Sequence, residues 1–359
     1  MVTRSTLEGA NVVRFIATMM IVAFHVALMP PLEIPSSLIF ITTYGGFGVP
    51  LFYTLSAFVL SYGYFGRLDK ADQIQKFYIR RFWRIAPLFY VMMTYYVTYL
   101  WVAHGAVVSI RSFITSATFT FNLVPQEVTG FVYASWSIGV EMVFYAVFPL
   151  ALLVIRGLKG ATVVFALAVG ISSLWREAFA GTVGALGNFG NFSFIAHAHY
   201  FAAGILAYFV WCKVEWTSAK RKAATVGSIF FLIGIGVWSA RLHTIGGPAL
   251  ILAAWALGFA TLVLGLSFQR AGKGLRLVSR LGETSFSLYL LHPAIIAMMM
   301  KTGLYERVYR AMPSPTLGYL GCLAMTFLLL FPLALQTYKH IEQRFYGVLL
   351  ARQRFVQPA

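Results

Sequence analysis

The chain has 359 residues, of which 59% are hydrophobic and 11% are charged, and its mean hydropathy is +0.77. A soluble globular domain carries about 25% charged residues, so this composition excludes a soluble protein and predicts a polytopic membrane protein. The net charge is +17, but the basic residues recur in short clusters between apolar runs. That distribution argues against nucleic-acid binding and is typical of membrane orientation signals.

The first apolar run, residues 11–29, is predicted to form a membrane helix that carries Arg14 and His25. Eleven positions correspond to three helical turns plus about 20°, so both side chains lie on one face, roughly 16 Å apart along the axis. Ionisable residues inside a span are costly and therefore indicate function. The run contains an arginine and is too long for a signal-peptide core, so it is not expected to be removed.

Ten apolar runs approach the length of about 20 residues that crosses a bilayer. They are 11–29, 38–62, 86–103, 136–155, 160–176, 193–211, 223–240, 247–268, 284–302 and 316–338. Of the 28 lysines and arginines, 22 lie on one set of alternate loops, so the positive-inside rule places both termini in the cytoplasm. We therefore expect an all-α integral membrane protein with about ten transmembrane helices.

Two connecting segments and one glycine-rich stretch carry further expectations. The segment 63–85 ends in Arg80, Arg81 and Arg84, interleaved with aromatic residues. These arginines suit either lipid headgroups at the interface or the phosphates of a ligand, and both interpretations stay open. The glycines of 45–48 lack a phosphate-loop pattern and predict a kink with close helix contacts. The loop 104–135 is too polar for a span and too apolar for a free loop, so we expect it to fold back onto the protein.

Glu141 is the acidic residue that falls inside a predicted span. It lies roughly 8 Å below the outer end of its helix, and His25 lies roughly 6 Å below the outer end of the first helix. A carboxylate beside an imidazole suits a general base, because it orients the ring and stabilises the imidazolium. An interhelical hydrogen bond with a structural role is the alternative. His292, inside the ninth run, is open to the same structural interpretation.

Cysteines and histidines give no metal pattern. Cys212 and Cys322 lie on separate runs, which argues against a disulfide framework. His197 and His199 are two positions apart, so on a helix they point in different directions. We expect no metal site.

Several motifs together resemble the acyltransferase 3 family of integral membrane O-acyltransferases, and they cover the chain from end to end. They are Arg14 and His25 at their spacing, GGFGVPLFYTLSAF (45–58), RRFWRIAPLFY (80–90), WSIGVEMVFYAVFP (136–149), LGETSFSLYLLHP (281–293) and HIE (340–342). One departure is Ala57, where the family usually has glycine after the LS pair.

The resemblance implies transfer of an acyl group from cytoplasmic acyl-CoA to a hydroxyl, most often on a carbohydrate. The acyl group is usually acetyl, with acetyl-CoA as its donor. It implies a multi-pass protein of the bacterial inner membrane. Members of the family often carry an additional extracytoplasmic esterase-like domain; here the sequence stops about twenty residues after the last apolar run, so we expect residues 1–359 to form a single transmembrane domain without one. The candidate catalytic residues are His25, by resemblance, and Glu141, by the depth argument. The candidate donor-binding residues are Arg14, Arg80, Arg81, Arg84, Trp136, Ser137 and His292, with Trp136 and Ser137 as possible donors to the thioester oxygen.

Two alternatives share these residues. A proton-coupled transporter of an anionic solute also needs buried arginine, histidine and carboxylate groups, although the chain has no visible internal repeat. An O-acyltransferase acting on a small natural product differs only in its acceptor. Oligomeric state has no signal in the sequence.

Overall fold

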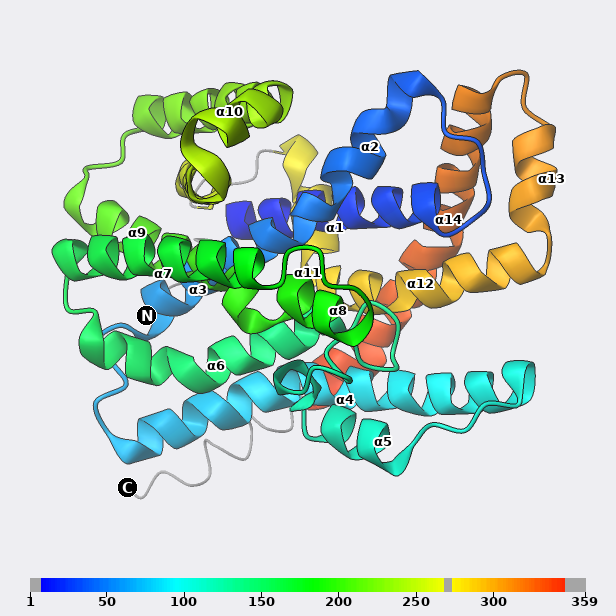
Figure 1. Ribbon diagram of the computed structural model, residues 1–359, viewed down its shortest axis with the longest axis horizontal. Helices are drawn as coiled ribbons and strands as arrows, with labels where there is room; N and C mark the ends of the chain where they lie inside the picture. Colours follow the sequence, from blue (N-terminus) through cyan, green and yellow to red (C-terminus); the bar gives the residue numbers. More distant parts are fainter. Residues whose placement is uncertain (1–7, 268–272, 346–359) are drawn as a thin grey trace.

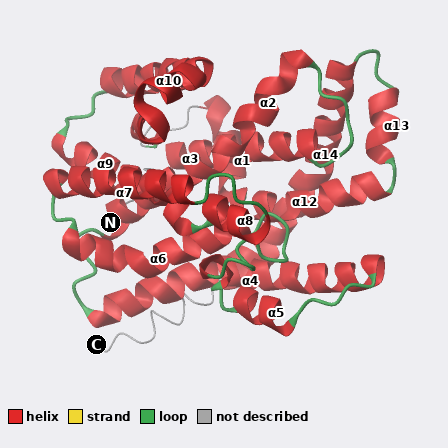
Figure 2. Cartoon of the chain, viewed as in Figure 1, coloured by secondary structure: helices red, strands yellow, loops and turns green. Residues whose placement is uncertain are grey.

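The computed structural model describes residues 8–267 and 273–345, and in that part of the chain the regular secondary structure is entirely helical (Figure 2). The α-helices are α1 (Glu8–Leu28), α2 (Ile39–Tyr44), α3 (Gly48–Tyr64), α4 (Ala71–His104), α5 (Ile110–Ala117), α6 (Trp136–Val154), α7 (Leu158–Ala178), α8 (Gly184–Phe192), α9 (Phe194–Lys213), α10 (Ser218–Leu266), α11 (Arg276–Glu283), α12 (Ser285–Lys301), α13 (Leu304–Arg310) and α14 (Pro315–Thr337). Short 3₁₀ turns are η2 (Ser36–Leu38), η3 (Gly45–Phe47), η4 (Phe121–Leu123) and η5 (Lys273–Leu275), and a π-helical turn, η6 (Tyr338–Glu342), follows α14. The predicted all-α class is confirmed.

The number of membrane-crossing helices agrees with the prediction. The described residues contain nine helices that are long and apolar enough to span a bilayer, or ten if α12 and α13, which meet at 73°, count as one span. The predicted cytoplasmic location of the termini depends partly on basic residues in 1–7, 268–272 and 346–359, which lie outside the described residues. That orientation therefore stays a prediction.

Helix α1 lies in the middle of the bundle (Figure 1) and packs against α3, α11 and α12. The contact with α3 depends on small residues, because a Cβ atom added to Gly48 would lie 2.4 Å from the carbonyl oxygen of Ala17. A Cβ on Gly45 would lie 2.8 Å from the Cβ of Phe24. The predicted kink with close helix contacts is confirmed, since η3 breaks the second span where these glycines meet α1.

Helix α4 is longer than the predicted third span. It begins at Ala71 and continues through Pro87 to His104, whereas the predicted third span covers only residues 86–103. A proline inside a helix removes one backbone hydrogen bond. The turns before it are anchored by Phe77 and Ile85, which are buried against the rest of the protein. The arginine-rich segment and the third span are thus one continuous helix.

Helix α10 contains the seventh and eighth predicted spans. Backbone angles at Gly247 (φ 63°, ψ −170°) interrupt the helix between them. The positive φ is accessible to glycine at little cost. The two spans therefore have the predicted bounds to within a few residues, with a break instead of a loop.

The connection between α4 and α6 folds onto the protein, as predicted. It forms α5 and η4, and Phe121 and Val132 are fully buried. The Asn122 side chain donates to the carbonyl of Phe192 over 2.8 Å and accepts from the amide of Phe194 over 2.9 Å. These two hydrogen bonds attach the connection to the junction of α8 and α9, which brings it beside the site described next.

Candidate active site

Arg14 and His25 line two different cavities that meet inside the bundle. The arginine cavity has a volume of about 90 Å³, and its wall includes Arg14, Val49, Ser56, Arg81, Arg84, Ser137, Glu141, Tyr145 and Tyr289. The histidine cavity has a volume of about 540 Å³, and its wall includes His25, Val49, Thr129, Gly130, Tyr133, Trp136, Phe192 and Tyr289. Because the two predicted polar positions of α1 are about three turns apart, one helix contributes to both cavities.

Three guanidinium groups and one carboxylate face the arginine cavity. Arg14 comes from α1, and Arg81 and Arg84 come from α4 one helical turn apart. Arg81 lies against the faces of Tyr64 and Tyr145, with its Cζ atom 5.6 and 5.9 Å from the ring centroids. Such stacking fixes a planar guanidinium in one orientation. The excess of positive charge favours an anionic ligand.

The fourth candidate arginine occupies a different position. Arg80 is not part of the cavity wall; it interacts with the hydroxyl of Tyr64. The sequence grouped Arg80 with the other arginines, and the structure brings together only Arg14, Arg81 and Arg84.

The predicted pairing of Glu141 with His25 is wrong. The Glu141 carboxylate accepts hydrogen bonds from Ser56, over 2.9 Å, and from the hydroxyl of Tyr145. It lines the arginine cavity, whereas His25 lines the other. Similar depth along two helices did not determine which way the side chains face, and the face of α6 that carries Glu141 is turned toward the arginines.

His292 of α12 is the side chain that contacts His25. Nδ1 of His25 lies 2.9 Å from the carbonyl oxygen of Ile21 and 3.1 Å from Nε2 of His292. Nδ1 of His292 contacts the carbonyl of Tyr289. Carbonyl oxygens only accept hydrogen bonds, so Nδ1 is the protonated nitrogen of both neutral rings.

This tautomer leaves Nε2 of His25 unprotonated. Within the described part of the chain, no side chain or backbone group forms a hydrogen bond with that nitrogen, and the ring lies on the cavity wall. One ring nitrogen of His25 is therefore hydrogen-bonded to Ile21 and His292, and the other is able to accept a proton. His292 itself is fully buried behind His25 and lines neither cavity.

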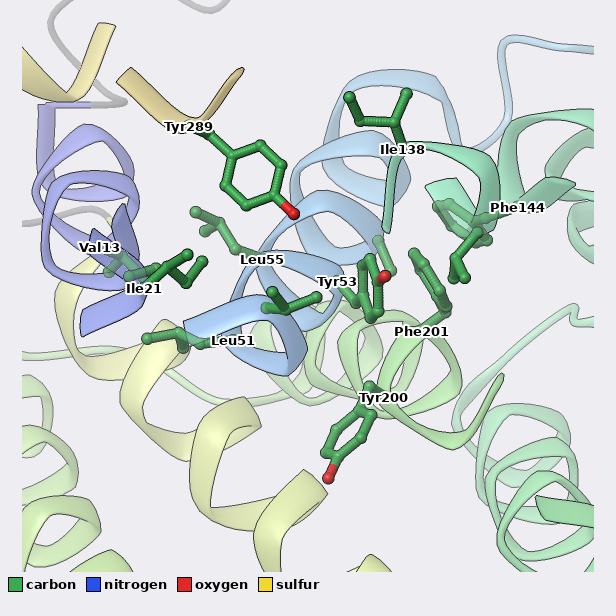
Figure 3. Packing of buried hydrophobic residues seen from close by; sticks show 14 of the residues in the cluster. Val13, Ile21, Leu51, Tyr53, Leu55, Ile138, Phe144, Tyr200, Phe201 and Tyr289 are labelled. Carbon is green, nitrogen blue, oxygen red and sulfur yellow. The ribbon is translucent and has the colours of Figure 1, made fainter. Parts of the chain in front are cut away.

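Tyr289 and Val49 form the boundary between the cavities, since both residues belong to both walls. The Tyr289 hydroxyl donates to the carbonyl of Ala134 over 2.8 Å and lies 2.6 Å from Oγ of Ser137. Figure 3 shows the Tyr289 side chain extending from α12, with its hydroxyl end pointing away from Val13 and Ile21 of α1. A single hydrogen-bonded side chain thus stands between the arginines and His25.

The candidates Trp136 and Ser137 are neighbours in sequence and serve different cavities. Trp136 lines the histidine cavity, where its ring lies 4.8 Å from that of Phe192. Ser137 lines the arginine cavity and contacts Tyr289. Both stand at the first turn of α6, which places the start of this helix at the junction of the two cavities.

Comparison with known proteins decides the family. The sequence pattern of a family described as an acyltransferase domain matches residues 7–335. The chain belongs to the acyltransferase 3 family. It is 27% identical over 322 residues to the acyltransferase MdmB of Streptomyces mycarofaciens, an alignment that covers 79% of this chain and 77% of that protein. No solved structure matches it.

Membership of the acyltransferase 3 family confirms the resemblance seen in the motifs and makes this protein a membrane acyltransferase. In the described residues, no group of three His, Cys, Asp or Glu side chains is arranged to hold a metal ion. The polar side chains that line the two cavities include the arginines, His25 and the hydroxyl groups of Ser137 and Tyr289.

The sequence did not single out Tyr289, Tyr145 or Ser56 of this acyltransferase. Helical spacing offered a signal for two of them. Tyr145 is four residues after Glu141, and Tyr289 is three residues before His292, so each lies on the same helix face as a candidate. Ser56 had no comparable signal, because its helix is apolar and its partner is on α6.

Proposed function

We propose that this acyltransferase moves an acyl group, acetyl as the first candidate, from cytoplasmic acyl-CoA to a hydroxyl group of a saccharide at the opposite face of the membrane. The observation that supports this proposal is that two polar residues of α1 line two different cavities. Arg14 lies with two further arginines on one cavity, and His25 presents an unprotonated nitrogen to the next.

The donor is an anion with a long uncharged arm that ends in a thioester. Arg14, Arg81 and Arg84 would bind its phosphates, because guanidinium groups form paired hydrogen bonds with phosphate oxygens. Because the arginine cavity is narrow, it suits the extended arm of the donor better than a bulky ring system. Glu141 holds Ser56 and Tyr145 on the same wall, so its role in this proposal is to position the donor site.

His25 would act as the general base. Its Nε2 takes the proton of the acceptor hydroxyl, whose oxygen attacks the thioester carbonyl. The C–O bond forms, the C–S bond breaks, and the proton passes from His25 to the leaving thiolate. Ile21 and His292 accept the hydrogen bonds of His25 Nδ1 and would stabilise the imidazolium between these steps.

The hydroxyl of Ser137 would donate to the thioester oxygen, and Tyr289, whose own proton is donated to the carbonyl of Ala134, would hold Ser137 in place. The two groups lie 2.6 Å apart at the boundary of the cavities, where a thioester arriving from the arginine cavity would meet His25. A hydroxyl donor at that point would stabilise the negative charge of the tetrahedral intermediate. Trp136, on the histidine side, would contact the acceptor.

The proposal places the protein in the bacterial inner membrane as a single transmembrane domain over residues 1–359, with both termini cytoplasmic. The bias of basic residues supports this orientation. Cysteine accessibility at added terminal cysteines, measured in intact and in permeabilised cells, tests it.

The test of function is label transfer in proteoliposomes that contain the purified protein. With radiolabelled acetyl-CoA on one side and membrane saccharide on the other, we expect label in the saccharide and its loss in His25→Ala. Uptake of an anionic solute without acyl transfer would support the proton-coupled transporter instead. Label in a small natural product, with none in saccharide, would keep the enzyme and change the acceptor.

A further inference from the structure

The wall of the histidine cavity differs in chemistry from that of its neighbour. Apart from His25, its polar side chains are uncharged, and no Asp, Glu, Lys or Arg lies on the part of the wall that the structure describes. Its largest side chains are aromatic and include Phe24, Phe131, Tyr133 and Trp136. Partial burial raises the pKa of the Tyr133 hydroxyl, so that group is neutral at physiological pH.

The aromatic rings stand close to the base. The Tyr133 ring lies 6.1 Å from that of His25, and the Phe24 ring lies 5.3 Å from it, both edge to face. The volume of about 540 Å³ is within the range of roughly 300–1,000 Å³ typical of small-molecule sites. An acceptor hydroxyl that reaches His25 would therefore have its own ring among these aromatic faces.

Residues 129–134 supply neutral polar groups to the same wall. They form a non-helical connection into α6, and it has positive φ angles at Gly130 (67°) and Ala134 (62°). A non-glycine residue in this region is strained, and here the carbonyl of Ala134 is held by the hydroxyl of Tyr289. The connection thus has a defined shape, and it adds no charge to the cavity wall.

From these observations we infer that the histidine cavity binds an uncharged sugar ring and discriminates against ionised acceptors. The inference rests on the proposed function and narrows its acceptor class. Aromatic side chains pack against the C–H faces of a sugar ring, while backbone groups and His25 contact its hydroxyls. A carboxylate in the same place would lose its hydration without gaining a counter-ion, which is costly.

The experiment measures binding in the absence of acyl-CoA, so it does not depend on turnover. Three matched probes are titrated onto the full-length protein in nanodiscs by saturation-transfer NMR: phenyl β-glucoside, phenyl β-glucuronide and phenyl β-glucosaminide. We expect the glucoside to bind at least about tenfold more tightly than either charged analogue. In Tyr133→Ala its Kd should rise roughly two- to tenfold, the value of one aromatic contact.

Tyr95→Ala is the matched control, because Tyr95 is 39% exposed, compared with 46% for Tyr133, and does not line the cavity. Its Kd for the glucoside should equal that of the wild type. Equal or tighter binding of the glucuronide or glucosaminide overturns the inference, as does the lack of any binding that depends on Tyr133. If acyl transfer occurs but a charged probe binds preferentially, this inference is overturned and the proposed function is kept. Neutral-sugar binding without acyl transfer would remove only the proposed function.

Discussion

Nδ1 of His25 on α1 lies 3.1 Å from Nε2 of His292 on α12, across 267 positions of sequence. His292 in turn contacts the carbonyl of Tyr289, so the three groups form a directed chain of hydrogen bonds. In such a chain the last ring fixes the tautomer of the first. From this geometry we propose that His292 has the orienting role that the sequence suggested for Glu141.

Replacing His292 tests that role. His292→Ala leaves one acceptor fewer for His25 Nδ1, and losing a buried hydrogen-bond partner costs about 1–3 kcal/mol, so kcat should fall roughly five- to a hundredfold. His292→Gln keeps an acceptor oxygen and should retain more activity. Steady-state kinetics and the pH profile of kcat are the measurements, with the KM for acyl-CoA expected to stay constant. Equal activity of all three proteins would leave His292 with a packing role.

The arginine cavity makes a prediction for substrate affinity. Arg81→Gln combined with Arg84→Gln should raise the KM for acyl-CoA at least about tenfold, because hydrogen bonds to charged groups contribute about 1.5–3 kcal/mol each. Arg80→Gln is the neighbouring control, since Arg80 lies off the cavity wall, and its KM should change less. An unchanged KM in the double variant would assign these arginines to lipid headgroups.

Glu141→Gln separates two possible roles of that carboxylate. Because Glu141 accepts from Ser56 and Tyr145 on the arginine cavity, the substitution should act mainly on the KM for acyl-CoA. A pure loss of kcat, with donor KM and protein yield preserved, would instead support the direct action on His25 that the sequence suggested. Saturation curves for acyl-CoA at fixed acceptor concentration distinguish these results.

The contact of α3 with α1 makes a prediction for stability. Gly48→Ala would place a Cβ 2.4 Å from the Ala17 carbonyl oxygen, and overpacking of this kind costs typically about 1–3 kcal/mol. Gly63→Ala in the same helix is the control, because nothing lies within 4 Å of its added Cβ and alanine is the better helix former. Thermal unfolding in detergent should show a lower Tm for Gly48→Ala only. If the Tm of Gly48→Ala were as high as that of Gly63→Ala, then α1 and α3 would accommodate the added methyl group without loss of stability.

The sequence determined properties that depend on one helix at a time. Composition and run length predicted the spans, and a spacing of eleven residues put Arg14 and His25 on one face of α1. The break at Gly247 and the continuation of α4 through Pro87 were missed, because tertiary packing decides whether a glycine or proline ends a helix.

Contacts between helices were harder to predict, because depth in the membrane does not give the rotation of a helix about its axis. Glu141 and His25 were predicted to lie at comparable depth, and yet Glu141 of α6 lines the cavity of Arg14 and its neighbours. His292 was recognised as an unusual buried histidine, but nothing local indicates which helix it faces. The pairing of α12 with α1 is set by the packing of the whole bundle.

The partition formed by Tyr289 has a consequence for the bilayer. The arginine cavity and the larger histidine cavity lie along the same helix, α1. Tyr289, held by its hydrogen bonds to Ala134 and Ser137, occupies the boundary between them together with Val49. Residues at this boundary therefore also close the path that an ion would take from one cavity to the other. A substitution that opened this boundary to admit a bulkier acyl group would also open that path to ions.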